Sequence, residues 1–155
     1  LKLGKECQQR NNCCSFSSGF LVKGDAEKIA KFLGVSLKEL EEKYLDEKEV
    51  FNTKLKRPKL KGKPYGKCIF FDGKGCKIHE VKPLQCRVGN CGGQGQDLAL
   101  WFMLNYQVNP TDPESIRQFK VYLDSGGKTL EGGSLEELVP DKKMLGKMLS
   151  FEVLR

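Results

Sequence analysis

The chain has 155 residues, a formal net charge of +7 at pH 7, seven cysteines and a single histidine. This length fits one domain, or one domain with a small appendage, and it is enough for a hydrophobic core. The longest apolar run, near residues 98–104, is far shorter than the roughly 20 residues of a membrane span, and no stretch has the pattern of a secretory signal. We therefore expect a protein without a membrane partner.

The cysteines are confined to the part of the chain from Cys7 to Cys91. Because seven is an odd number, they cannot all pair within one chain. A disulfide framework, as in a secreted domain, would be expected to reach the last third of the chain too, whereas a local set of metal ligands would not. The distribution therefore favours a metal site over disulfides or unrelated buried thiols.

Two short helices over residues 25–45 are the first elements that the sequence predicts. They follow residues 1–18, which are polar and indicate a loop. We expect Asp25 to cap the first helix, and Ser36 with Glu39 forms a capping box for the second. The pair has the outline of a helix–turn–helix, but its mixed charges favour a packing layer over DNA binding.

A basic segment follows, and residues 46–67 are expected to lack regular structure because prolines and glycines interrupt them. The segment from Lys54 to Lys67 contains no acidic residue. Its charge predicts an anionic partner such as RNA, DNA or an acidic protein face, and the alternative is a solvated loop that self-repulsion keeps extended. Its basic residues are Lys54, Lys56, Arg57, Lys59, Lys61, Lys63 and Lys67.

Two short strands, at 68–71 and 76–79, are predicted on either side of a turn at 72–75. The turn would bring together Cys68 and Cys76, which begin these strands. His79 is three residues after Cys76, so in a strand the two side chains would face opposite sides and would not form a catalytic pair. We expect His79 to be either a fourth metal ligand or a half-buried strand residue.

The last third of the chain is predicted to be helical. A largely buried helix is expected over about 96–107, and a second helix begins near Thr111 and stops at Gly126. Ser134 begins a single helical turn, and a short amphipathic helix lies at 144–149. These apolar stripes favour core packing over a cofactor groove.

The chemistry of the cysteines narrows the choice of metal. No C-x-x-C pair occurs, which excludes the usual zinc-ribbon and thioredoxin-like motifs. Soft thiolate ligands select zinc or iron–sulfur clusters, and four of them suit a tetrahedral zinc ion or a cubane 4Fe–4S cluster. Cys13 and Cys14 are adjacent, so either one ligates while the other packs, or two centres share them. The candidate ligands are Cys7, Cys13, Cys14, Cys68, Cys76, Cys86 and Cys91.

The order of these motifs resembles the YkgJ-type cysteine-cluster family, which is described as zinc- or iron-chelating. The family's signature C-x-x-C-x-x-C-C matches residues 7–14 in spacing, with Arg10 in place of the second cysteine. Its helix Asp-x-x-x-Ile-Ala-x-Phe-Leu-Gly matches residues 25–34. Its later motif C-x-Ile-Tyr-x-x-Arg-Pro-x-x-Cys-Arg matches residues 76–87, with His79 for tyrosine and lysine for the first arginine.

The resemblance covers about residues 7–91 and implies a cytoplasmic protein whose cysteines gather on zinc or an iron–sulfur cluster. The family includes the flagellin lysine methylase FliB, so the resemblance also implies an alternative, an S-adenosylmethionine-dependent protein lysine methyltransferase-like enzyme. Arg10 replaces one of eight possible ligands. Whether the chain is an enzyme stays open, and a basic nucleic-acid or ribonucleoprotein binding module is a further alternative.

From these observations we expect an α+β protein of mostly short helices with a small β-hairpin, organised around a cysteine-ligated metal centre. Residues 1–95 would form the metal-binding domain, with 96–155 as a helical C-terminal extension packed on it. Irregular cysteine spacing favours an iron–sulfur cluster over zinc. Arg87 is either a hydrogen-bond donor near the thiolates or a surface arginine. The expected ligand set joins Cys68, Cys76 and Cys86 to one N-terminal cysteine, with Cys91 as the next candidate.

Overall fold

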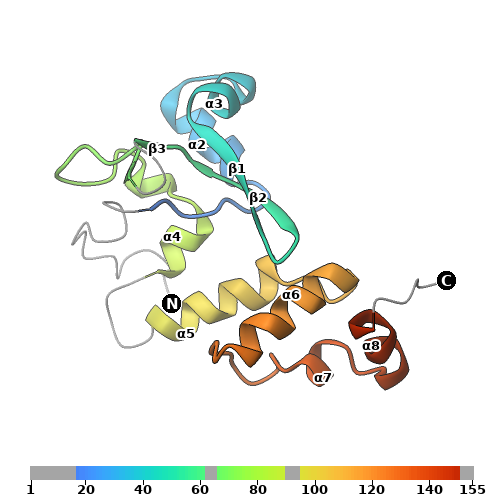
Figure 1. The fold of residues 1–155 in the computed structure, drawn as a ribbon. Coiled ribbons are helices and arrows are strands. Elements are labelled where there is room, and N and C mark those ends of the chain that lie inside the picture. Colours follow the sequence, from blue (N-terminus) through green and yellow to red (C-terminus); the bar gives the residue numbers. More distant parts are fainter. Residues whose placement is uncertain (1–16, 62–65, 90–94, 151–155) are drawn as a thin grey trace. The chain divides into compact units, whose positions relative to one another are not determined.

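The chain divides into two compact units in the computed structural model, which describes residues 17–61, 66–89 and 95–150. Unit 1 comprises Leu1–Lys48 and Leu55–Gln96, and unit 2 comprises Glu49–Lys54 and Asp97–Arg155. Among the described residues, short helices predominate and a small hairpin provides most of the strand, so the expected α+β class is confirmed (Figure 1). No helix in these residues is long and apolar enough to span a membrane.

The described elements of unit 1 are two helices, then short strands, then two short helices, and those of unit 2 are helical apart from the hairpin tip. In chain order they begin with α2 (Asp25–Leu33), α3 (Leu37–Lys43), β1 (Leu45–Val50), β2 (Thr53–Pro58), β3 (Leu60–Lys61), β4 (Lys67–Cys68), the 3₁₀ helix η1 (His79–Val81) and α4 (Leu84–Val88). They continue with α5 (Gly95–Phe102), the π-helix η2 (Met103–Gln107), α6 (Pro113–Asp124), α7 (Leu135–Leu138) and α8 (Lys142–Leu149).

The two predicted N-terminal helices are present, but only one of them begins as expected. Ser36 caps α3, because its hydroxyl accepts a hydrogen bond from the Glu39 N–H at 3.1 Å. Asp25 does not cap α2. The N-cap is Gly24, whose φ of 92° is a left-handed conformation that glycine adopts at little cost. The Asp25 side chain is therefore available for contacts elsewhere in unit 1.

A β-hairpin occupies part of the segment that was expected to be irregular, so the prediction of a structureless linker over residues 46–67 is wrong. A two-residue turn, Phe51-Asn52, joins β1 to β2, and both residues have positive φ, at 49° and 58°. Two-residue hairpin turns often need this backbone. Asparagine tolerates it, whereas a bulky side chain such as Phe51 rarely adopts it, so the sequence carries only a weak turn signal here.

The region around Cys68 contains less strand than predicted. β4 pairs antiparallel with β3, which places Cys68 opposite Leu60. Phe71 and Cys76 form a single isolated bridge across the turn. Instead of a paired hairpin, the predicted strands at 68–71 and 76–79 are joined to each other by this single bridge.

The turn at residues 72–75 is confirmed. The Asp72 carboxylate accepts hydrogen bonds from the N–H groups of Lys74 and Gly75, both at 2.8 Å. His79 begins η1 and is not in a strand. The expectation that the His79 and Cys76 side chains face opposite sides assumed a strand, so it does not apply here.

The core of unit 1 forms between α2, α3 and the chain around β4 and η1. Tyr44 stacks on Phe70 with ring centroids 5.5 Å apart. Cys68 is part of this core, and Cys76 packs against it. Its buried members are Leu21, Ile29, Ala30, Leu40, Leu45, Cys68, Phe70, Phe71 and Ile78.

Unit 2 contains the C-terminal helices that the sequence predicts. The expected helix over 96–107 is present as α5, which continues into η2; Phe102 is fully buried, but Trp101 is about a third exposed. Ser134 caps α7 by accepting a hydrogen bond from the Glu137 N–H. The buried core residues of unit 2 are Met103, Val108, Ile116, Phe119, Val139, Leu145 and Met148.

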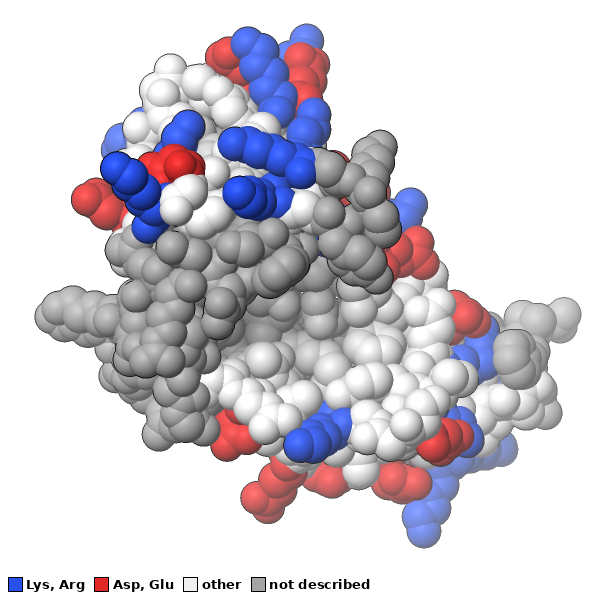
Figure 2. Space-filling model, turned by 60° about the vertical axis from the view of Figure 1, so that its left-hand side comes forward, with Lys and Arg blue, Asp and Glu red and all other residues white. Residues whose placement is uncertain are grey.

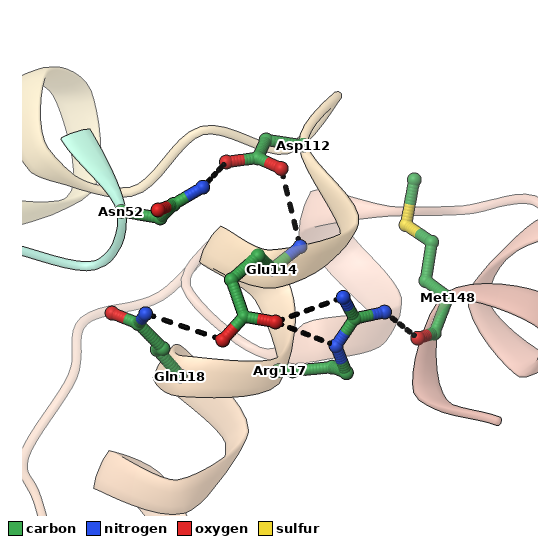
Figure 3. Close-up of polar contacts among 6 residues, drawn as sticks. All are labelled: Asn52, Asp112, Glu114, Arg117, Gln118 and Met148. Carbon is green, nitrogen blue, oxygen red and sulfur yellow. Dashed lines mark hydrogen bonds and ion pairs between the residues drawn. The ribbon is translucent and has the colours of Figure 1, made fainter. Parts of the chain in front are cut away.

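The tip of the β1–β2 hairpin belongs to unit 2 and contacts α6. The Phe51 ring meets Phe119 and Tyr122 edge to face, with both centroid distances at 5.6 Å. The Asn52 amide donates to the carboxylate of Asp112, the N-cap residue of α6, at 2.7 Å (Figure 3). These contacts hold the tip in its positive-φ conformation.

Candidate metal centre

The described candidate ligands all belong to unit 1. Cys68 in β4 is buried, and Cys76 and Cys86 are partly buried. The remaining candidates, Cys7, Cys13, Cys14 and Cys91, lie outside the described residues, as does Arg10.

Over residues 17–61, 66–89 and 95–150, no three histidine, cysteine, aspartate or glutamate side chains gather as a metal-binding group. Cys68, Cys76 and Cys86 therefore do not make a complete site by themselves. Their thiol chemistry fits zinc or an iron–sulfur cluster. A four-thiolate site of the expected kind needs at least one cysteine from outside the described residues.

Cys86 lies on α4 and packs directly against the backbone of Gly19. A Cβ atom placed on Gly19 would overlap the Cys86 Sγ atom and would lie 3.1 Å from the Cys86 nitrogen. Only a residue without a side chain leaves room for the sulfur here. The Cys86 thiol therefore packs closely against the backbone of Gly19.

The segment from Gly19 to Asp25 holds α4 at each of its first four residues. Besides the Gly19 contact with Cys86, the Phe20 N–H donates to the Gln85 side-chain oxygen at 2.7 Å. The contacts of Asp25 reach the residues on either side, Leu84 and Arg87. Figure 1 shows this segment, in blue, running beside α4. The chain that follows the N-terminal cysteines is therefore joined to the helix that carries Cys86.

Asp25 is the most heavily used polar side chain of this junction and is 2% exposed. Its Oδ2 atom accepts hydrogen bonds from the N–H groups of Val22 and Leu84, both at 2.9 Å. Its Oδ1 atom accepts from the Arg87 guanidinium at 3.0 Å. A buried carboxylate is stable only when it is paired and hydrogen-bonded, and Asp25 meets both conditions.

Arg87 follows Cys86 in the chain and is not a freely solvated arginine. Its side chain is 28% exposed and forms the ion pair with Asp25. Its Nε atom is buried and has no hydrogen-bond partner among the described residues. A buried guanidinium N–H without an acceptor is costly, and the Arg87 Nε–H is an unsatisfied donor of this junction within the described residues.

His79 also has a buried polar atom of this kind. Its Nδ1 atom is buried and lacks a hydrogen-bond partner in the described part of the chain. Burial lowers the pKa of His79, and the positive charge of Lys82 lowers it further. A neutral imidazole with one open ring nitrogen is compatible with the predicted role of fourth ligand and with that of a half-buried residue.

Sequence reasoning missed Gly19 and Gln85 and gave Asp25 a different role. The signal for Asp25 was indirect, because an aspartate at the first position of a helix after a glycine N-cap is free to bond elsewhere. Its partners Leu84 and Arg87 are 59 and 62 positions away. Only the folded chain brings them together.

Part of the predicted basic surface is matched by acidic groups in the same unit. Lys56 Nζ is 2.5 Å from Glu41 Oε1, and Arg57 Nε is 3.4 Å from Asp46 Oδ1. Figure 2 shows acidic side chains interspersed with lysines and arginines on the face that it draws. The anionic partner of the segment Lys54 to Lys67 stays a prediction.

Comparison with known proteins gives one result for this region. A family model described as "CxxCxxCC: Putative zinc- or iron-chelating domain" matches residues 6–101, a range that includes all seven cysteines. Searches of the curated proteins and of the solved structures found no match to the chain.

Proposed function

The chain belongs to the CxxCxxCC family of zinc- or iron-chelating domains, and from this premise we propose that its cysteines hold one metal centre in unit 1. The observation that carries the proposal is the junction between residues 19–25 and α4. This junction ties the chain that follows the N-terminal cysteines to the helix that bears Cys86. The resulting protein would bind metal through thiolates from distant parts of the sequence.

Covalent reach supports a shared site. Cys14 precedes Gly19 by five positions, and Cys91 follows Cys86 by five positions. Five residues span at most about 18 Å. Because Gly19 and Cys86 are in contact, both outer cysteines are close enough along the chain to reach the same centre. We propose a ligand set of Cys68, Cys76 and Cys86 with one N-terminal cysteine, and Cys91 as the next candidate.

An iron–sulfur cluster is our preferred occupant, with zinc as the alternative. Structural zinc sites favour closely spaced ligand pairs, and the chain has no C-x-x-C pair. Either occupant would supply a cation that offsets the mutual repulsion of the thiolates. A cytoplasmic location is part of the proposal, because a reducing compartment keeps thiols available for metal.

Anaerobic purification followed by elemental analysis and visible spectroscopy tests the proposal. An iron–sulfur cluster predicts iron and acid-labile sulfide with a visible absorption that bleaches on reduction, and zinc predicts a colourless protein with bound Zn²⁺. Replacing Cys68, Cys76 or Cys86 by serine should lower the bound metal in each case. A folded protein that carries no metal, and takes up none on reconstitution, would contradict the proposal.

The control is a substitution that weakens the fold away from the cysteines. Ser115 is buried in unit 2, and its hydroxyl accepts a hydrogen bond from the Asn109 N–H at 2.8 Å. Ser115→Ala should lower stability and leave the metal content unchanged. If it lowers the metal content as much as Cys86→Ser does, the cysteine effects reflect loss of fold and not loss of ligands.

The alternatives of a methyltransferase-like enzyme and a nucleic-acid or ribonucleoprotein binding module stay predictions. Neither the family match nor the described part of the chain adds an observation in their favour.

A further inference from the structure

The Asp25 carboxylate divides its two oxygen atoms between two tasks. Among the described residues, Oδ2 bonds backbone groups, the N–H groups of Val22 and Leu84. Oδ1 bonds the Arg87 guanidinium in the same part of the chain. One oxygen therefore fixes the start of α4, and the other fixes the side chain that comes directly after Cys86.

One hydrogen-bond donor of the Arg87 guanidinium has no acceptor among the described residues. The NH2 end of the guanidinium faces Asp25, while the buried Nε–H has no acceptor among the described residues. Guanidinium N–H groups are strong donors to anionic acceptors, and they keep their charge at all ordinary pH values. A thiolate, or a sulfide of a cluster, is the kind of anionic acceptor that would satisfy this donor.

We infer that Asp25 is a positioning residue of the metal centre and that it acts through Arg87. By fixing the guanidinium of Arg87, the residue that follows Cys86 in the chain, Asp25 would keep a positive charge and a hydrogen-bond donor near the thiolates and so lower the cost of gathering their negative charge. The inference rests on the proposed function, because it needs a thiolate-bound metal in unit 1. It assigns a role to a residue that is not a ligand.

The test measures Zn²⁺ affinity of the full chain by competition with a chromophoric chelator, and Co²⁺ spectra check that thiolates are bound. Asp25→Asn keeps an oxygen that can accept from Val22 and Leu84 but turns an N–H₂ group towards Arg87. Loss of an outer-shell partner typically costs 10–100-fold in metal affinity, so we expect a loss of about that size. Arg87→Gln should give a similar loss, and Arg87→Lys should recover part of it.

The double variant separates positioning from a general effect on folding. If Asp25 acts through Arg87, then Asp25→Asn combined with Arg87→Gln should lose no more affinity than Arg87→Gln alone. If Asp25 only supports the fold, the two losses should multiply. If Asp25→Asn folds poorly, the single Arg87→Gln variant still decides the question. A folded Arg87→Gln protein with unchanged Zn²⁺ affinity would overturn the inference.

Glu114→Gln provides the matched control. It removes an arginine–carboxylate pair in unit 2, in which Arg117 and Glu114 are 2.8 Å apart, and it should leave Zn²⁺ affinity unchanged. If the unaltered protein binds no Zn²⁺ or Co²⁺ through thiolates, the proposed function fails and this inference fails with it. If the unaltered protein binds and Asp25→Asn binds equally well, only the inference fails.

Discussion

Gly19 and Cys86 are 67 positions apart in the chain, and the sulfur of Cys86 occupies the space where a Cβ atom of residue 19 would lie. The contact joins the segment that follows the N-terminal cysteines to the helix that bears a central candidate ligand. A side chain at position 19 would therefore have to displace the Cys86 sulfur. The geometry of the candidate centre therefore depends on a glycine that carries no chemistry of its own.

Gly19→Ala should displace Cys86 and weaken both the fold and metal binding. Overpacking of this kind typically costs about 1–3 kcal/mol, and denaturant unfolding would measure it. Gly146→Ala is the control, because Gly146 lies inside α8 and a Cβ atom there meets nothing within 4 Å. That change should stabilise the protein by about 0.5–1 kcal/mol. Equal effects from both substitutions would show that the Gly19 contact is not close.

Two substitutions of Asn52 separate the free-energy cost of its positive φ from the stability that its hydrogen bond to Asp112 contributes. Asn52→Gly loses the bond to Asp112, worth about 0.5–1.5 kcal/mol, but keeps a residue that adopts a φ of 58° freely. Asn52→Ala loses the bond and adds a left-handed cost of about 1–2 kcal/mol. Denaturant unfolding of the two variants should therefore rank alanine below glycine. The reverse order would mean that the turn is not in this conformation.

The elements that local chemistry controls could be predicted from the sequence. Ser36 and Ser134 cap their helices as expected, because a cap needs only the residues two or three positions on. The hairpin could not be predicted with the same ease. Its turn is held by contacts of Phe51 and Asn52 with α6, far along the chain.

The sequence marks the candidate ligands, which stay a prediction, but it does not mark the residues that support them. The cysteines and Arg87 are visible as a motif, whereas Gly19 and Gln85 have no pattern that marks them. Asp25 was visible as a helix start, and its bonds to Leu84 and Arg87 depend on tertiary structure. Residues that hold a site together leave a weaker trace in the sequence than those that form it.

His79 should make the protein less stable in mild acid. Burial lowers the pKa of His79 in the folded protein below its ordinary value of 6.5, so the unfolded chain takes up a proton at a higher pH than the folded one. Stability is therefore lost as the pH falls through about 6.5, until the folded protein is protonated as well.

His79→Gln removes this proton uptake. With both proteins in the same metal state, the variant should gain stability relative to the unaltered protein between about pH 8 and about pH 5. Denaturant unfolding at several pH values would measure the difference. A stability difference that stays constant with pH would mean that His79 titrates alike in the folded and unfolded chains.

The thiol count distinguishes a metal centre from a disulfide framework. If the cysteines bind metal, protein purified without reductant, then denatured in a chelator, should give close to seven reactive thiols, the number in the sequence. A disulfide framework would leave about one, because seven is odd. In the folded, metal-loaded protein, the same reagent should react slowly with the four thiols of the proposed ligand set, and adding the chelator should speed that reaction, because coordinated thiolates are shielded. Fast reaction of all seven thiols before the chelator is added would mean that none of them is coordinated.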